Sequence, residues 1–347
     1  MITVIIAGGS GTRLWPLSTS SNPKQLLRLT NDKTMVQNTY ERVKAMSEAV
    51  YVVPDISHAE ALKAQLPELS EGNFVVEPGR RGTASCIIAA LAHVVKRHGQ
   101  DVPIAFVHAD HHIRDTEGFK ASFNVAAKYA ADYERVTLIG IEPTYPATGF
   151  GYIEKGEVIE EGHLWRVKQF KEKPDFETAK QFIASGRFVW NCGYFVGTGK
   201  SFLKEFEQHN PQRVADYEAL VAASSPEEYK QAYLASEDDA IDYALMERTD
   251  NLQVIPASFD WRDVGNFNDV HEANQLDEDN NFTSGDNIHT IEIENSYIRN
   301  EDSDRPIAVI GLDNVVVVNT KDGILVARKD VSPKVGEIAK KIQAQSK

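Results

Sequence analysis

The sequence predicts an α/β domain built on a mixed, mostly parallel sheet, followed by a small all-β domain of β-helix-like character. Two observations predict the first domain: strand-like and helix-like segments alternate over residues 1–145, and a glycine-rich turn follows the first strand directly. A third predicts the second domain, because near residue 275 the composition becomes polar and short β-like segments follow. We therefore expect one domain over residues 1–274 and another over residues 284–347.

The alternation in the first part of the chain gives the order of its elements. Segments rich in β-branched residues predict strands over residues 2–7, 49–54, 73–78, 102–110 and 135–141. Between them, apolar residues recur at helical spacing over residues 33–46, 58–69, 82–99 and 117–133. Such regular alternation, with apolar strands, is typical of a largely parallel sheet covered by helices on both faces.

The rest of the chain is more varied. Residues 149–174 predict hairpin-like strands, residues 175–186 a helix, and residues 188–197 a strand broken by Gly193. Residues 200–250 are helical in pattern, and residues 252–265 predict a strand that runs into a turn. After a polar linker, short strands are expected over residues 288–300, 307–320 and 323–329, with a helix over residues 335–347.

Composition and charge exclude several classes of function. A formal net charge of −14 argues against a nucleic-acid surface, which is usually basic. No apolar stretch reaches the roughly 18 to 20 residues of a membrane helix, and no basic region precedes the first apolar run, as it would in a signal peptide. Cys86 and Cys192 are far apart and not spaced as metal ligands, which suits a cytoplasmic protein without disulfides.

The glycine-rich turn, "AGGSGTR" (residues 7–13), predicts a phosphate site. Glycines let the backbone N–H groups approach phosphate oxygens at the carboxyl edge of a sheet. Thr12 and Arg13 stand where a phosphate-binding loop of NTPases would need Lys and Ser or Thr. Leu14 replaces the third glycine of the dinucleotide motif, which argues against a nicotinamide oxidoreductase. Arg13 and Lys24 are then the cations available beside the turn.

Several further motifs, in one order along the chain, resemble the sugar-1-phosphate nucleotidylyltransferase family. They are "AGGSGTRLWPLS" (7–18), "PKQLL" (23–27), "EPGRRGTA" (77–84), "VHADHHI" (107–113), "TGFGYI" (148–153), "FKEKP" (170–174), "WNCGYF" (190–195), "AIDYALME" (240–247) and "DWRDVGNF" (260–267). Trp15 followed by "PKQLL" is most similar to the members that act on mannose 1-phosphate and GTP. The resemblance implies a Rossmann-like nucleotidyltransferase fold and the synthesis of GDP-mannose and pyrophosphate with Mg²⁺.

The resemblance also implies the roles of individual residues. Catalysis would depend on Arg13, Lys24 and Asp110. The nucleotide would be bound by Gly8, Gly9, Ser10, Gly11, Thr12, Arg13, Lys24, Glu77 and Arg80. The sugar phosphate would be bound by Gly149, Glu172, Lys173, Asn191 and Asp242. The metal would be held by Asp110 together with Asp263 or Asp260, of which Asp263 precedes the "VG" turn as in the family.

The chemistry explains why no nucleophilic triad is found. A sugar phosphate is already largely ionised at neutral pH, because its second pKa lies near ~6, so the attacking oxygen needs no protein base. The reaction instead needs positioning and charge neutralisation. His111 and His112 invite a zinc site, but no third ligand stands at suitable spacing.

Two kinds of alternative remain. One keeps the reaction but changes the substrates, as in a glucose-1-phosphate thymidylyl- or uridylyltransferase; the other is a non-catalytic subunit that binds nucleotide sugars. The chain departs from the family's usual residues at Arg81 and at His108, where the family usually has a proline or a small residue, and its "WNCGY" differs from the family's "WNSGM". It also ends where longer members continue into an isomerase domain. A homodimer is possible, whereas neither nucleic acid nor membrane is expected as a partner.

Overall fold

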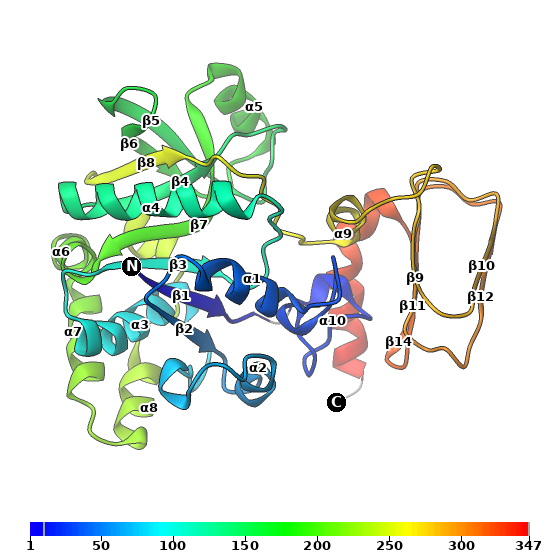
Figure 1. Cartoon of the computed structure of the whole chain (residues 1–347), viewed down its shortest axis with the longest axis horizontal. Coiled ribbons are helices and arrows are strands. Elements are labelled where there is room, and N and C mark those ends of the chain that lie inside the picture. Colours follow the sequence, from blue (N-terminus) through cyan, green and yellow to red (C-terminus); the bar gives the residue numbers. More distant parts are fainter. Residues whose placement is uncertain (10, 346–347) are drawn as a thin grey trace.

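A computed structural model describes residues 1–9 and 11–345, and it shows a large α/β domain joined to a small β domain (Figure 1). In the described chain, eight strands form the large sheet in the order β2-β1-β3-β7-β4-β8-β6-β5. They are β1 (Ile2–Ala7), β2 (Ala49–Pro54), β3 (Pro103–His108), β4 (Val136–Ile141), β5 (Gly151–Glu160), β6 (Leu164–Lys171), β7 (Phe188–Thr198) and β8 (Leu252–Pro256).

The sheet is mixed, as predicted. β1 lies parallel to β2 and β3, and β4 lies parallel to β8. β7 runs antiparallel to both β3 and β4 in the middle of the sheet, and β5 and β6 add further antiparallel pairs. Because β1, β3 and β8 run in the same direction and end at the same edge of the sheet, the loops that follow them can bring side chains together.

Helices cover both faces of this sheet. The helices of the large domain are α1 (Met35–Lys44), α2 (Ala59–Gln65), α3 (Gly82–His98), α4 (Thr116–Tyr133), α5 (Phe176–Ser185), α6 (Gly199–His209), α7 (Pro211–Ala222), α8 (Pro226–Ala235) and α9 (Phe267–Ala273). One core packs α1 and α4 against the sheet, and a second packs α3, α6 and α7 against the opposite face. Threonine and aspartate side chains cap several of these helices, as Thr34 does in a capping box at α1.

Two local predictions are corrected by the structure. Residues 73–78 do not form a continuous strand but contact β2 through two isolated bridges, Val52 with Phe74 and Asp55 with Glu77. The reason is that Pro54 has no N–H, so the ladder of hydrogen bonds is interrupted between the bridges. The predicted break at Gly193 is also wrong, because β7 continues through it; Gly193 has φ 73°, and the register against β4 shifts nearby.

The C-terminal domain consists of short strands stacked mainly in parallel. They are β9 (Phe282–Gly285), β10 (Ile288–Ile291), β11 (Tyr297–Asn300), β12 (Ile307–Ile310), β13 (Val315–Thr320) and β14 (Gly323–Arg328). β9, β11 and β13 stack in one sheet and β10 and β12 in a second, so successive coils resemble a short β-helix, which β14 ends by pairing antiparallel with β13. β9 begins inside the polar stretch that the sequence predicts as a linker.

A third hydrophobic core joins the two domains. It contains Leu14 and Trp15 from just after the glycine-rich turn, Phe267 of α9, and Val316 of the C-terminal sheet. The last helix, α10 (Val335–Gln345), adds Val335 and Ala339 to this core and lies between the two domains, against the turn Thr12–Leu14 (Figure 1). The segment that carries the glycine-rich turn is therefore braced by the C-terminal domain.

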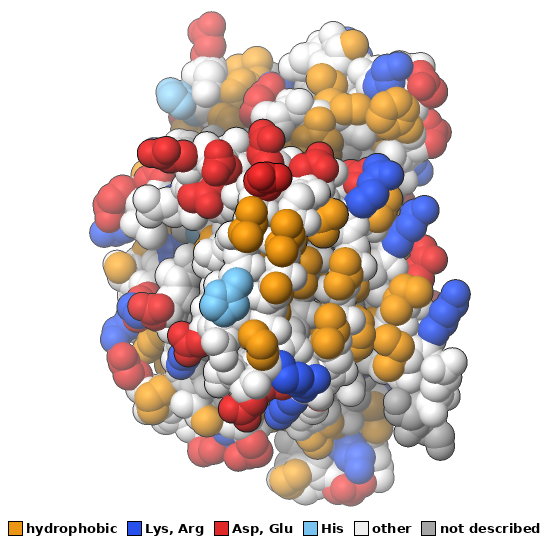
Figure 2. Space-filling view, turned by 90° about the vertical axis from the view of Figure 1, so that its right-hand side faces the viewer, with side chains coloured by type: hydrophobic (Ala, Val, Ile, Leu, Met, Phe, Trp, Pro, Cys, Tyr) orange, Lys and Arg blue, Asp and Glu red, His pale blue; other side chains and the backbone are white. Residues whose placement is uncertain are grey.

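The outer face of the C-terminal domain is unusually apolar. Figure 2 shows hydrophobic side chains gathered on the face that β10 and β12 present to solvent. Ile291 and Ile310 in these strands are 58% and 63% exposed, and Leu312 just after β12 is 44% exposed. In the described parts of the chain, no helix has both the length and the apolar character to cross a membrane.

Candidate active site

The glycine-rich turn leaves β1 and folds tightly against a second turn. Gly9 and Gly11 have φ 97° and 55°, the left-handed region that favours glycine, while the predicted Ser10 lies outside the described residues. A Cβ on Gly11 would lie 2.7 Å from the Cβ of Lys24 and 2.9 Å from its backbone nitrogen, so only glycine fits here. Ser18 Oγ also donates a hydrogen bond to the Gly11 carbonyl. The close packing of the two turns places Lys24 beside the glycines.

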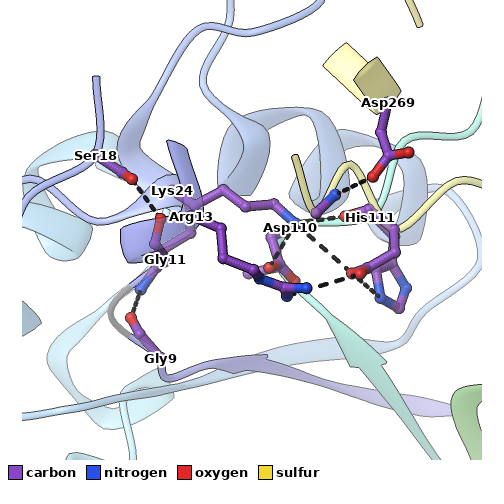
Figure 3. A network of polar contacts seen from close by, with 12 residues as sticks. Gly9, Gly11, Arg13, Ser18, Lys24, Asp110, His111 and Asp269 are labelled. Carbon is purple, nitrogen blue, oxygen red and sulfur yellow. Dashed lines mark hydrogen bonds and ion pairs between the residues drawn. The ribbon is translucent and has the colours of Figure 1, made fainter. Parts of the chain in front are cut away.

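Lys24 lies at the centre of a cluster of charges. Its side chain is buried, with Nζ 3.0 Å from Asp110 Oδ2 and 3.7 Å from Asp263 Oδ1, and it donates a hydrogen bond to the Asp263 carbonyl. Arg13 Nη2 lies 3.9 Å from Asp263 Oδ2, on a largely exposed side chain. Figure 3 shows Lys24 and Arg13 extending toward Asp110 from their separate turns. The structure therefore brings together Arg13, Lys24, Asp110 and Asp263, which lie far apart in sequence.

The cluster keeps both carboxylates ionised. Burial alone would raise the pKa of Asp110, but the Lys24 ammonium and the neighbouring histidines outweigh it, so that the pKa falls well below its usual value. The same balance of burial against Lys24 lowers the pKa of Asp263. Two ionised carboxylates that converge on one cation match what Mg²⁺ needs from a protein, since Mg²⁺ keeps several waters and takes phosphate oxygens as further ligands. The residues present thus fit a magnesium ion.

His111 lies beside this cluster and is held in place by two aromatic side chains. Its Nδ1 accepts a hydrogen bond from Trp261 Nε1 at 3.1 Å and lies 2.9 Å from the Tyr194 hydroxyl. Burial lowers the pKa of His111 to about 3, with a further contribution from His108, so the ring is neutral. With Nδ1 accepting, the proton sits on Nε2, which lies 3.8 Å from Asp263 Oδ1. His111 therefore lies beside Asp263 without a hydrogen bond to it, and within the described residues no group of three His, Cys, Asp or Glu side chains could hold zinc.

A cavity of about 350 Å³ adjoins the charge cluster. Its lining includes Arg13, Asp110 and Asp263, and also every residue that the sequence predicts for the sugar phosphate: Gly149, Glu172, Lys173, Asn191 and Asp242. A pocket of this size is typical of small-molecule sites. Two of the three candidate metal ligands, Asp110 and Asp263, thus share one cavity with the predicted sugar ligands.

Polar groups inside the cavity are arranged as a small network. Asn191 Nδ2 donates to Asp242 Oδ1 at 2.9 Å, and Lys173 Nζ lies 2.8 Å from Glu172 Oε1. Glu172 Oε2 is buried and has no hydrogen-bond partner among residues 1–9 and 11–345. A Cβ on Gly151 would lie 2.4 Å from this oxygen, so Gly151 makes room for it. An unpartnered buried carboxylate oxygen is costly unless a ligand donates to it.

Burial and the nearby Glu172 carboxylate raise the pKa of Asp242 to about 7. Asp242 begins a short π-helical turn (Asp242–Met246), a feature often found at functional sites. Near neutral pH this carboxyl group can therefore carry a proton and donate a hydrogen bond as well as accept one.

Among the predicted residues, the described glycines of the turn, Thr12 and Lys24 do not line this cavity, and neither do Asp260, Glu77 and Arg80. Asp260 accepts hydrogen bonds from the backbone N–H groups of Arg114 and Asp115, at 3.0 Å and 2.8 Å, and does not reach Asp110. Glu77 is buried beneath the turn, bonded to the Tyr233 hydroxyl, and its Oε2 lies 3.3 Å from where a Cβ on Gly8 would be. Arg80 Nε lies 3.6 Å from Asp55 Oδ2 on an exposed side chain. Glu77 thus lies next to Gly8 of the glycine-rich turn, and Arg80 lies beside Asp55.

Sequence reasoning missed several residues that line the cavity. His108, Phe150 and Trp261 all contribute to its walls. Phe150 and Trp261 pack edge to face at 5.1 Å, and Trp261 also packs on His111 at 5.2 Å. Their positions in the sequence could have identified them, because each of these residues lies within two residues of a predicted ligand in the motifs "VHADHHI", "TGFGYI" and "DWRDVGNF".

Comparisons with known proteins identify families and relatives that this chain is similar to. The family model described as nucleotidyl transferase matches residues 2–280, and a model described as MannoseP isomerase/GMP-like beta-helix domain matches residues 285–342. A mannose-1-phosphate guanylyltransferase of Escherichia coli (strain K12) is 36% identical over 99% of this chain and 74% of its own length. The guanylyltransferase RfbM of Salmonella typhimurium is 36% identical over 97% and 71%.

A solved structure covers the whole architecture. The crystal structure described as mannose-1-phosphate geranyltransferase from Thermus thermophilus aligns over 99% of both chains, with a TM-score of 0.87 at 27% identity. The arrangement of both domains is therefore shared with a protein of known structure.

Proposed function

The chain belongs to the nucleotidyl transferase family, and from that premise we propose that it transfers GMP from GTP to mannose 1-phosphate, giving GDP-mannose and pyrophosphate. One observation carries the proposal: the Lys24 ammonium is held between Asp110 and Asp263, beside a cavity lined by the side chains that the sequence predicts to bind the sugar. The names of the 36%-identical relatives supply the choice of sugar and base.

The reaction is an in-line displacement at the α-phosphorus. An oxygen of the sugar phosphate forms the new bond to this atom, and the bond between the α-phosphorus and the bridging oxygen to the β-phosphate breaks, so that pyrophosphate leaves with both electrons. The attacking oxygen is ionised at neutral pH, so no protein group has to remove a proton. The protein must instead offset the repulsion between two anions, and the described parts of the glycine-rich turn, with Arg13 and Lys24, provide N–H groups and positive charge for this.

Asp110 and Asp263 would hold the magnesium ion. When bound there, the ion would neutralise phosphate charge and orient the phosphates for attack. The Lys24 ammonium then keeps the two carboxylates in place and contributes its own charge, rather than acting as an acid or base. Asp260 is left out of the metal site in this proposal, because its oxygens already accept two backbone N–H groups.

A matched pair of variants tests the metal site. We expect Asp110→Asn to lose Mg²⁺-dependent synthesis by about 10²-fold or more, as removal of a central electrostatic group does. Asp260→Asn should show the same Mg²⁺ titration as the unmodified protein, although its folding stability falls. A normal titration for Asp110→Asn, or a lost one for Asp260→Asn, would reverse the assignment of the two aspartates.

The sugar side of the cavity binds the acceptor substrate. Glu172 Oε2, Asn191 and Asp242 offer acceptors and donors to hydroxyl groups, and Lys173 offers a cation to the sugar phosphate. Gly149 has open space around the position of a Cβ, which leaves its backbone accessible from the cavity. Glu77 and Arg80 contact the nucleotide from the opposite side of the turn in this proposal.

The experiment measures substrate choice directly. The protein is incubated with Mg²⁺ and each of GTP, UTP, dTTP and ATP, against mannose 1-phosphate or glucose 1-phosphate, and pyrophosphate release is followed. GTP with mannose 1-phosphate should give the highest kcat/KM. Preference for UTP or dTTP with glucose 1-phosphate would keep the reaction class but refute the substrates, and pyrophosphate release with none of the pairs would favour a non-catalytic subunit.

We further propose a cytoplasmic homodimer. Reducing conditions suit the two buried free thiols, Cys86 and Cys192. The apolar outer face of β10 and β12 supports self-association, because single soluble chains rarely expose such patches (Figure 2). Light scattering should give twice the chain mass, and Ile310→Asp should halve it, whereas Ile56→Asp, at 59% exposure in the large domain, should not. A monomer in the unmodified protein would refute the dimer.

A further inference from the structure

Two histidines flank Asp110, and the structure uses them differently. The ring centroids of His108 and His111 lie 5.0 Å apart, with planes tilted by 43°. The nitrogens of His111 are engaged, Nδ1 by Trp261 and Tyr194 and Nε2 on the side of Asp263. His108 lines the same cavity, yet within residues 1–9 and 11–345 its ring forms no hydrogen bond or ion pair. His111 therefore supports the site, whereas neither ring nitrogen of His108 has a hydrogen-bond partner in the described part of the chain.

The position of the His108 ring is set by the neighbouring strand. β3 pairs with β7 antiparallel as far as Phe106 opposite Phe195, and His108 and Gly193 each lie two residues beyond this last pair. A Cβ on Gly193 would lie 2.5 Å from His108 Nε2. The missing side chain of Gly193 is therefore what gives the ring its place in the cavity.

The surroundings of Gly193 belong to the sugar side. The Gly193 N–H donates to Asn191 Oδ1 at 3.0 Å, and Asn191 Nδ2 donates in turn to Asp242. The described glycines of the first turn, together with Glu77 and Arg80, are absent from the lining of this cavity. The imidazole of His108 therefore faces the space assigned to the sugar rather than the space assigned to the base.

We propose that His108 is a specificity-determining residue, whose imidazole forms a hydrogen bond with a hydroxyl group of the hexose 1-phosphate. A neutral imidazole has one nitrogen that donates a hydrogen bond and one that accepts. A hydroxyl group can pair with either nitrogen, because it can accept as well as donate. This inference rests on the proposed function, because it assumes that the cavity holds the sugar. A site built to bond a hydroxyl group discriminates strongly against an analogue that lacks it.

The test separates the two substrates. His108→Leu removes the polar atoms and keeps an apolar side chain of similar size. We expect its KM for mannose 1-phosphate to rise about 10-fold, the effect of one hydrogen bond in a part-buried site, with the KM for GTP changed less than twofold. Calorimetry with mannose 1-phosphate alone should show the same loss of affinity. His93→Leu is the control, since His93 bonds the Gly72 carbonyl outside the cavity and should leave both KM values unchanged.

Deoxy sugars make the test specific. The 2-, 3-, 4- and 6-deoxy forms of mannose 1-phosphate are compared on the unmodified protein and on His108→Leu. One of the four should lose affinity on the unmodified protein but lose nothing further on His108→Leu, because its hydroxyl is the partner of His108. Equal losses for all four on both proteins, or a rise in the KM for GTP alone, would overturn the inference.

Folding and function are controlled separately. His108→Gln restores a donor and an acceptor, and it should recover part of the affinity if His108→Leu is folded, as judged from its melting curve. If His108→Leu does not fold, His108→Gln and the deoxy series on the unmodified protein still decide the matter. An unmodified protein that makes no GDP-mannose refutes the proposed function, whereas an active one that is indifferent to His108 refutes only this inference.

Discussion

The two sides of the cavity are built in different ways. On the nucleotide side, Arg13 and Lys24 are carried by turns, and close packing of Gly11 on Lys24 sets their positions. On the sugar side, Asn191 is carried by β7, and Glu172 directly follows β6, both in the large sheet. Strand-borne groups are held by the sheet itself, while groups on turns need support from elsewhere.

That support comes from the C-terminal domain. α10 packs against the turn Thr12–Leu14, and a Cβ on Gly336 would lie only 3.2 Å from Arg13 Cγ. Leu14 and Trp15 are buried in the core that the C-terminal strands complete. The small domain therefore has a structural role in the site although it contributes none of the predicted ligands.

The largest effect should come from the buried cation of the nucleotide side. Lys24→Met removes the charge between Asp110 and Asp263, and we expect kcat to fall about 10³-fold, because charge stabilisation is the main requirement of phosphoryl transfer. Steady-state kinetics measure the loss, and circular dichroism checks that the variant is folded. Near-normal turnover in a folded Lys24→Met protein would remove Lys24 from the mechanism.

On the sugar side, a single substitution should affect one substrate only. Glu172→Gln keeps the size of the side chain but takes away the charge of the unpartnered oxygen, Oε2. We expect the KM for mannose 1-phosphate to rise about 10- to 30-fold, since a hydrogen bond to a charged group is worth about 1.5–2 kcal/mol, while the KM for GTP stays the same. The opposite order of effects would show that the two sides of the cavity have been exchanged.

The packing of α10 against the turn Thr12–Leu14 predicts a smaller effect on the KM for GTP, from a residue outside the cavity. Gly336→Leu places a side chain against Arg13, so we expect the KM for GTP to rise about threefold to tenfold with the KM for mannose 1-phosphate unchanged. Lys340→Leu, at an exposed position of the same helix, is the control. If the two variants behave alike, α10 does not position Arg13.

The sequence predicts many of the strands and much of the charge cluster, and it does so for different physical reasons. Strand segments such as residues 2–7 and 135–141 are predictable because their β-branched runs are buried on both faces. The grouping of Lys24, Asp110 and Asp263 was expected from motif resemblance, and the structure shows it. The brace by α10 could not be predicted, because contact between residues 13 and 336 depends on how two domains pack, which no local pattern encodes.

Two predictions of local structure are wrong because a single residue alters the pairing between strands. Residues 73–78 have the composition of a strand, but the missing N–H of Pro54 on the neighbouring strand interrupts the pairing. Gly193 was expected to break β7, but its positive φ is absorbed by a shift in register, and its missing side chain leaves room for His108. In both cases the deciding contact is with another strand, which the local sequence does not show.

The last expected effect is on stability rather than on activity, and it compares one carboxyl group from each side. Burial, with the nearby Asp55 carboxylate, raises the pKa of Glu77 to about 7 although the hydrogen bond from the Tyr233 hydroxyl lowers it, and burial with Glu172 raises the pKa of Asp242 to about 7. Each group is protonated in the folded protein but ionised in the unfolded chain between about pH 4 and pH 7. The unfolded state then binds fewer protons, so the free energy of unfolding falls as pH rises through this window, by at most about 1.4 kcal/mol per pH unit for each group.

Urea unfolding at several pH values measures this slope. His111 and His112, whose pKa values are lowered to about 3 and 4 mainly by burial, act in the opposite direction in the same window, so the difference between proteins is the informative quantity. Glu77→Gln and Asp242→Asn should each gain stability relative to the unmodified protein as pH rises from 4 to 7. If only Asp242→Asn gains stability, then of the two carboxyl groups only Asp242 is protonated in the folded protein near neutral pH. Glu77 is then ionised next to the glycine-rich turn, where its negative charge would repel a bound phosphate.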